Sequence, residues 1–88
     1  MAKLIKTTGE MMEIEPKNKK KFTLEELQGF VGGYIEPVYL PKGEVMICNE
    51  EGKLHDLPLN PQATSVAYQF GLCQSIVGDV VICRKGQM

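Results

Sequence analysis

Two apolar runs of four residues constrain the fold of this chain more than any other feature. Val45–Cys48 reads VMIC and Val80–Cys83 reads VVIC. Neither run alternates with polar residues, which is typical of a strand inside a sheet that is covered on both faces. We therefore expect two central strands, with Cys48 and Cys83 as small hydrophobic residues of the core.

Three further segments have the composition of strands. Lys3–Thr7 and Met11–Glu15 flank a turn that contains glycine, which predicts a hairpin. Tyr34–Leu40 is rich in β-forming residues but contains Pro37. Proline cannot donate to a ladder, so this strand is expected at a sheet edge or with a kink.

The residues after the first apolar run carry a turn signal. Asn49 and Gly52 occupy the first and fourth positions of a type I turn. The simplest geometry is a β-hairpin that pairs Val45–Asn49 with Lys53–Leu57.

Capping residues predict two short helices. Thr23 and Glu26 form a capping box before one apolar stretch, and Gly32 ends that helix. Asn60 followed by Pro61 starts the second helix. The expected apolar face of the second helix consists of Ala63, Val66, Ala67 and Phe70.

The length of 88 residues predicts a single domain over 1–88, with a frayed tail over 84–88. Its fold class is α+β, with a small mixed or antiparallel sheet of five or six strands and two short helices. A chain of this size buries only about 60% of its unfolded surface. Self-association is a common way to gain burial, so we expect a homo-oligomer.

Composition limits the compartment and the partners. The net charge is −1, which argues against a dedicated nucleic-acid binder. Four lysines between Lys17 and Lys21 are interpreted as a solvated loop. Three cysteines without a CxxC pair indicate reduced thiols in a cytoplasm, here that of a bacterial host. No segment approaches ~20 apolar residues and no signal peptide is evident, so no membrane contact is expected.

Catalysis is not expected. Glu50, Glu51 and His55 lie close in sequence, and the alternative is a hydrolase that uses His55 with either acid. Adjacent acids on a turn point apart, and no second histidine completes a common metal set. The cysteines lie in apolar runs, where burial raises a thiol pKa. No catalytic residue, metal or cofactor is therefore predicted.

The start of the second helix is the first choice for a ligand-facing surface. Free backbone amides at a helix start favour anions. The nearby turn adds polar and charged groups, and exposed tyrosines could stack on a base. The predicted ligand-binding residues are Asn49, Glu50, Lys53, Asn60, Gln62, Thr64, Tyr34 and Tyr39.

Four motifs in this order resemble a known family over roughly Phe22–Cys83. They are VGGYIE from Val31, NEEGKL from Asn49, LPLN from Leu57 and GDVVI from Gly78. The chain is similar to small proteins known only as a domain of unknown function, which are often encoded by phages and other mobile elements of bacteria. The residues that match are Gly32, Gly33, Ile35, Glu36, Asn49, Glu50, Gly52, Leu57, Pro58 and Asn60.

The resemblance implies a small, non-enzymatic accessory protein that binds and neutralises a host component. Our first hypothesis is an anti-defence protein that sequesters a nucleotide-type immune signal. The alternative is a direct protein inhibitor of a host nuclease, such as a CRISPR effector. In that case the edge strand around Pro37 and the Glu50–Glu51 turn would form the contact, with the acids imitating phosphates. Both hypotheses rest on genome context and size.

Overall fold

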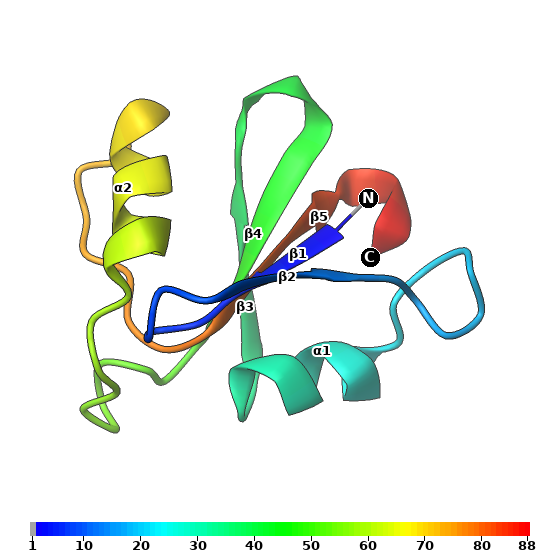
Figure 1. The fold of residues 1–88 in the computed structure, drawn as a ribbon, viewed down its shortest axis with the longest axis horizontal. Helices are drawn as coiled ribbons and strands as arrows, with labels where there is room; N and C mark the ends of the chain where they lie inside the picture. Colours follow the sequence, from blue (N-terminus) through cyan, green and yellow to red (C-terminus); the bar gives the residue numbers. More distant parts are fainter. Residues whose placement is uncertain (1) are drawn as a thin grey trace.

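The structure, a computed structural model, describes residues 2–88 as one antiparallel sheet between two helices (Figure 1). The sheet order is β2-β1-β5-β4-β3, which confirms the α+β class and the five-strand count. The strands are β1 (Ala2–Ile5), β2 (Met11–Ile14), β3 (Ile35–Tyr39), β4 (Glu44–Asn49) and β5 (Val80–Arg84). The helices are α1 (Leu24–Val31) and α2 (Pro61–Gln69), with 3-10 turns at Pro41–Gly43 and Lys85–Gln87.

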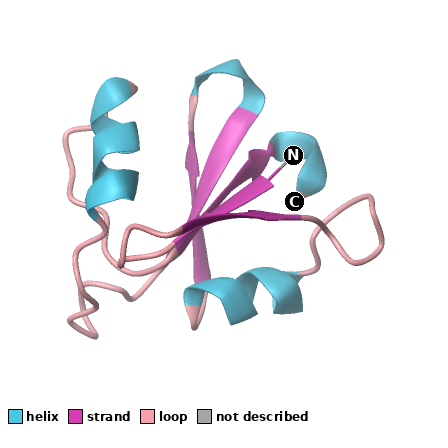
Figure 2. Cartoon of the chain, in the orientation of Figure 1, coloured by secondary structure: helices cyan, strands magenta, loops and turns pink. Residues whose placement is uncertain are grey.

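The two apolar runs form the interior strands β4 and β5, as predicted. Side chains alternate across a strand. Val45 and Ile47 belong to the core beneath α1, whereas Met46 and Cys48 belong to the core beneath α2. Both sides of β4 are therefore buried, which explains why its sequence does not alternate. Figure 2 shows the helices on different sides of the twisted sheet.

Helix α1 begins and ends where its sequence signals predict. The Thr23 hydroxyl accepts from the Glu26 amide at 3.1 Å, and the Glu26 carboxylate accepts from the Thr23 amide at 2.9 Å. These backbone bonds, with one from Lys17, lower the pKa of Glu26. Gly32 takes the left-handed conformation, with φ of 81°, and ends the helix.

Helix α2 starts at the predicted cap, but its buried face differs from the prediction. Ala63 and Ala67 are fully buried against the sheet. Phe70 was expected on this face and instead follows the last helical residue, with 37% of its surface exposed. The helix ends at Gln69, one residue before Phe70, so Phe70 does not continue the apolar stripe.

The predicted hairpin of Val45–Asn49 with Lys53–Leu57 is wrong. Strand β4 already pairs with β3 on one side and β5 on the other, so no ladder position remains. The chain turns instead: the His55 amide donates to the Glu51 carbonyl, and Asp56 adopts a φ of 52°. The local turn signal was correct, but β4 pairs with the strand that precedes it, β3, and with the last strand, β5.

The last residues, for which the sequence predicts a frayed tail, contact the segment before α1. Lys85–Gln87 forms a 3-10 turn, and the Phe22 amide donates to the Gln87 carbonyl at 2.6 Å. Within residues 2–88, neither helix has the length or apolar character needed to cross a bilayer.

Candidate functional site

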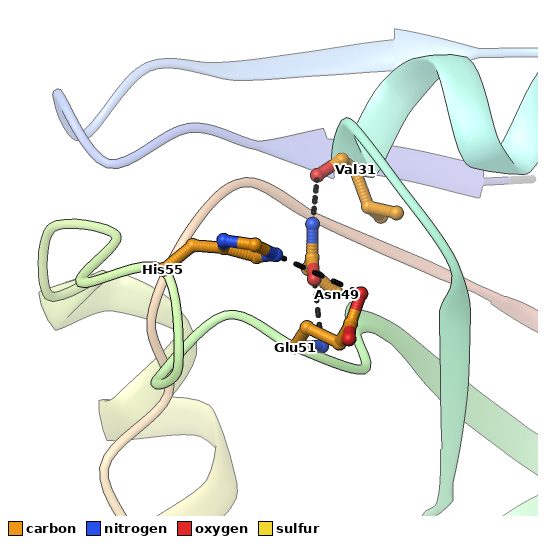
Figure 3. Close-up of polar contacts among 4 residues, drawn as sticks. All are labelled: Val31, Asn49, Glu51 and His55. Carbon is orange, nitrogen blue, oxygen red and sulfur yellow. Dashed lines mark hydrogen bonds and ion pairs between the residues drawn. The ribbon is translucent and has the colours of Figure 1, made fainter.

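Asn49 fixes the turn that follows β4 (Figure 3). Its side-chain amide donates to the Val31 carbonyl at 3.0 Å, and its side-chain oxygen accepts from the Glu51 amide at 2.8 Å. A Cβ on Gly33 would lie 3.0 Å from the Asn49 amide nitrogen, so a larger residue there would press on it. The Asn49–Asp56 turn is thus tied to the end of α1.

Two cavities flank this turn, and Asn49 and Glu51 line both. The first cavity, of about 220 Å³, has an apolar floor that includes Cys48 and Ile76. The second cavity, of about 460 Å³, lies toward the end of α1. Polar groups of the first cavity come from Glu36, Glu50, Glu51, Lys53, Gln74 and Ser75. The second is lined by Gln28, Gly29, Gly32, Gly33, Tyr34 and His55 as well.

The acids and the histidine of the turn are distributed over the two cavities, and of these described residues only Glu51 and His55 are paired. The His55 Nε2 lies 3.6 Å from a Glu51 carboxylate oxygen, with 60% and 43% of the two side chains exposed (Figure 3). Glu50 lines the first cavity, whereas His55 lines the second. In the described part of the chain, no three His, Cys, Asp or Glu side chains are grouped to hold a metal ion.

The buried thiols are poor nucleophiles. Burial, with the nearby Glu36 charge, raises the pKa of Cys48 to about 12. Burial also raises the pKa of Cys83. Both thiols therefore stay protonated at neutral pH, whereas Cys73 is exposed to solvent.

The structure brings together four of the eight predicted ligand-binding residues. Asn49, Glu50 and Lys53 line the first cavity, and Tyr34 lines the second. The Glu50 amide donates to the Tyr34 carbonyl at 2.8 Å, which joins the turn to the start of β3.

The residues at the start of α2 lie apart from these cavities. Asn60 is fully buried, and its amide donates to the carbonyls of Ile5 at 3.0 Å and Gly78 at 2.9 Å. Its side-chain oxygen accepts from the Ala63 amide at 3.0 Å, so no polar atom faces a ligand. The Thr64 hydroxyl bonds to the backbone of residue 76, and Gln62 is exposed.

The remaining predicted groups are distant from the turn. Tyr39 ends β3, where the Lys85 ammonium lies 5.1 Å from its ring centre. The Lys17–Lys21 loop lies at the opposite end of the molecule from the Asn49–Asp56 turn (Figure 1). These lysines and Lys53 therefore cannot bind the same phosphate within one chain.

Two motif glycines have an architectural role that sequence reasoning missed. A Cβ on Gly52 would lie 2.8 Å from a Val77 methyl, and one on Gly78 would lie 2.9 Å from a Leu57 methyl. The turn therefore packs closely on the segment that leads into β5. Glu36 was also missed as a lining residue, although its place in the GGYIE motif was a signal.

The fold and this surface define a small α+β domain with a turn between two open cavities. The chain belongs to the family Domain of unknown function (DUF3846), whose model matches residues 3–87. No curated protein and no solved structure matches the chain.

Proposed function

We propose that this is a non-enzymatic, phage-type accessory protein that binds and neutralises a component of its bacterial host in the cytoplasm. The observation that carries the proposal is the pair of cavities beside the Asn49–Asp56 turn. They offer concave surface next to charged groups, the usual form of a binding site. The exposure of the His55–Glu51 pair to solvent and the protonated buried thiols support capture in place of turnover.

The charges around the first cavity favour a basic protein as the target. Glu36, Glu50 and Glu51 all line this small space, together with Lys53. Carboxylates gathered in this way repel one another, and a cationic partner relieves that repulsion. Proteins that bind nucleic acid present such cationic surfaces. We therefore favour direct inhibition of a host nuclease, for example a CRISPR effector.

Capture of a nucleotide immune signal is the second candidate. Tyr34 supports it, because this residue is 65% exposed beside the second cavity and its ring offers a stacking surface. The phosphates of a nucleotide would be bound weakly here, since Lys53 shares the first cavity with three carboxylates. For this reason nucleotide capture ranks below protein binding.

A comparison of two double variants tests the first candidate. Glu50→Gln with Glu51→Gln removes two charges at the turn, and Glu15→Gln with Glu25→Gln removes the same charge elsewhere. Immobilised wild type and the control pair should retain the same protein from a bacterial lysate, and the turn variant should lose it. Salt should elute that protein, because dissolved ions screen the attraction between exposed charges. The screening length is about 10 Å at 0.1 M salt and becomes shorter as salt is added. Purified, the retained protein should be a nuclease that wild type inhibits at stoichiometric ratio.

A nucleotide panel separates the two candidates. Native mass spectrometry with cyclic nucleotides and ADP-ribose derivatives should give no mass shift if the target is a protein. A mass shift that Tyr34→Ala abolishes would establish nucleotide capture instead. Retention that is equal in both double variants would overturn the acidic turn as the contact.

A further inference from the structure

The two edges of the sheet differ in what their outward backbone groups can bind. At β3, the Glu50 amide donates to the Tyr34 carbonyl and the Leu40 amide donates to the Glu44 carbonyl. Bonded pairs alternate along an antiparallel ladder. In the observed register, the residues between, Ile35, Pro37 and Tyr39, direct their backbone groups away from β4.

Pro37 therefore occupies the central outward position of the β3 edge. It removes no bond to β4, because its missing N–H would point into solvent. It also leaves the edge without its middle donor, a common protection against pairing with another chain. The sequence predicted that the β3 edge around Pro37 could be a contact strand. This edge is thus poorly suited to pair with a strand of another chain.

The opposite edge, β2, carries no such block. The Lys6 amide donates to the Glu10 carbonyl, one step beyond the Ile5–Met11 pair. By the same alternation, Met12 bonds to β1, whereas Met11 and Glu13 direct both N–H and C=O outward. The side chains of Met11 and Met12, on opposite faces, are 45% and 42% exposed.

We propose that two copies of this chain pair antiparallel through β2, so that their two sheets become one. The two-fold axis runs perpendicular to the sheet and passes between Met12 and the partner's Met12. Met11 then forms a hydrogen-bonded pair with the partner's Glu13, and Glu13 with the partner's Met11. Each pair exchanges two N–H···O=C bonds, so every outward group of both residues is satisfied.

Charge and strand length select this register over its neighbours. Residues opposite one another in a sheet must share a face, so registers change in steps of two. One step places Glu13 opposite the partner's Glu13, and like charges in that position are destabilising. The other step places Glu13 opposite the partner's Gly9, outside the strand. In the Met12-centred register, Glu13 keeps its own cross-strand neighbour Lys3 and lies directly opposite the partner's Met11, with the partner's Glu13 only diagonal to it.

The assembly closes on itself. Both β2 edges are consumed, and the outer edges of the joined sheet are the two β3 strands with Pro37. A closed two-fold dimer follows in place of a filament. This inference concerns the side of the sheet remote from the Asn49–Asp56 turn and stands whether or not the proposed function is correct.

Sedimentation equilibrium and native mass spectrometry of the full chain test the dimer. Wild type should be dimeric, and Glu13→Pro should be a folded monomer, because proline here removes an outward donor and no bond to β1. Circular dichroism and thermal unfolding check that the variant is folded. A wild-type protein that remains monomeric at every concentration, or that forms a series of ever larger oligomers, would overturn the proposal.

A charge exchange at the axis keeps the test independent of proline. Met12→Lys and Met12→Glu each place like charges on two facing side chains, whose Cα atoms lie about 4.5 Å apart in the dimer. Each variant alone should be monomeric, and a mixture should give a 1:1 heterodimer by mass. The control Tyr39→Lys, on the β3 edge, should remain dimeric. Dimers that persist in both Met12 variants, a mixture without heterodimer, or loss of the dimer only in Tyr39→Lys would each refute pairing through β2.

Discussion

The two helices cover the same sheet but are held to it by different interactions. Beneath α1 the contacts are large and apolar: Phe22, Leu27 and Val31 are each buried. The rings of Phe22 and Phe30 meet edge to face, with centroids 6.3 Å apart. A fully buried side chain of this size contributes roughly 2 kcal/mol, so α1 is held mainly by the hydrophobic effect.

Helix α2 is held by small residues and polar bonds. Ala63 and Ala67 are its fully buried residues in the core between the helix and the sheet. Asn60 joins the helix start to Ile5, a residue 55 positions away in the chain. Thr64 adds a bond to the segment that leads into β5. The difference teaches that α1 contributes large apolar side chains to its core, whereas α2 contributes alanines and buried hydrogen bonds that tie together three distant segments.

The largest effect is expected from removal of Asn60. Asn60→Ala removes the helix cap and leaves the carbonyls of Ile5 and Gly78 without the donor that they share, a loss of roughly 3–5 kcal/mol in the free energy of unfolding. Urea denaturation measures it. Asn60→Ser keeps a cap acceptor but has no amide for the two carbonyls, so it separates the two contributions. A loss under about 1 kcal/mol for Asn60→Ala would show that the polar ties do not hold α2.

Leu27→Ala is expected to have the next largest effect. Leu27 is 2% exposed beneath α1, and truncation of such a leucine costs about 3 kcal/mol through lost burial and the cavity left behind. The control is Leu24→Ala in the same helix, where the side chain is 57% exposed and the change should stay within about 0.5 kcal/mol. Equal losses in the two variants would contradict the apolar account of α1.

Enlargement of a small residue tests the other face. Ala67→Leu should lower the free energy of unfolding by about 2 kcal/mol, because α2 has no space to accept added volume against the sheet. The exposed Gln69→Leu in the same helix serves as the control. An Ala67→Leu protein as stable as wild type would mean that α2 can move away from the sheet.

The smallest effect is the acid sensitivity of the α1 cap. The amides of Thr23 and Lys17 lower the pKa of Glu26, so the folded state prefers its carboxylate more than the unfolded state does. The resulting stability is present above the ordinary glutamate pKa and is lost as the pH falls through the lowered value. Glu26→Gln should therefore flatten the acid limb of a plot of stability against pH. The matched substitution Glu25→Gln, with no such bonds among those found, should leave that limb as steep as in wild type.

Local signals in the sequence predicted much of this fold. The Thr23–Glu26 capping box and Gly32 bounded α1, because a cap involves residues only a few positions apart. The unbroken apolar character of Val45–Cys48 and Val80–Cys83 required burial on two faces, which only interior strands have. The predicted hairpin after β4 is wrong, because a turn signal does not reveal that the preceding strand β3 and the distant strand β5 already occupy both edges of β4.

The candidate site was predicted only in part, because the sequence shows which residues are neighbours in the chain but not which strands pair. Asn49, Glu50 and Lys53 were found because they are neighbours in one polar turn. Glu36 joins them only through the pairing of β3 with β4, where it lies opposite Cys48. Asn60 was recognised as a cap, but its bonds to Ile5 and Gly78 depend on the closing of the whole sheet.

The Asn49–Asn60 segment resembles a display loop on a rigid frame. An asparagine amide anchors each end to backbone elsewhere in the fold, and Gly52 holds the middle against Val77. Between these anchors the tip projects into solvent, with 75% of Leu54 exposed. Residues at the tip can change without loss of a ladder bond or a core contact. The same frame can therefore carry tips of different chemistry, and a library randomised over 53–55 would vary the surface of the turn while the rest of the fold stays constant.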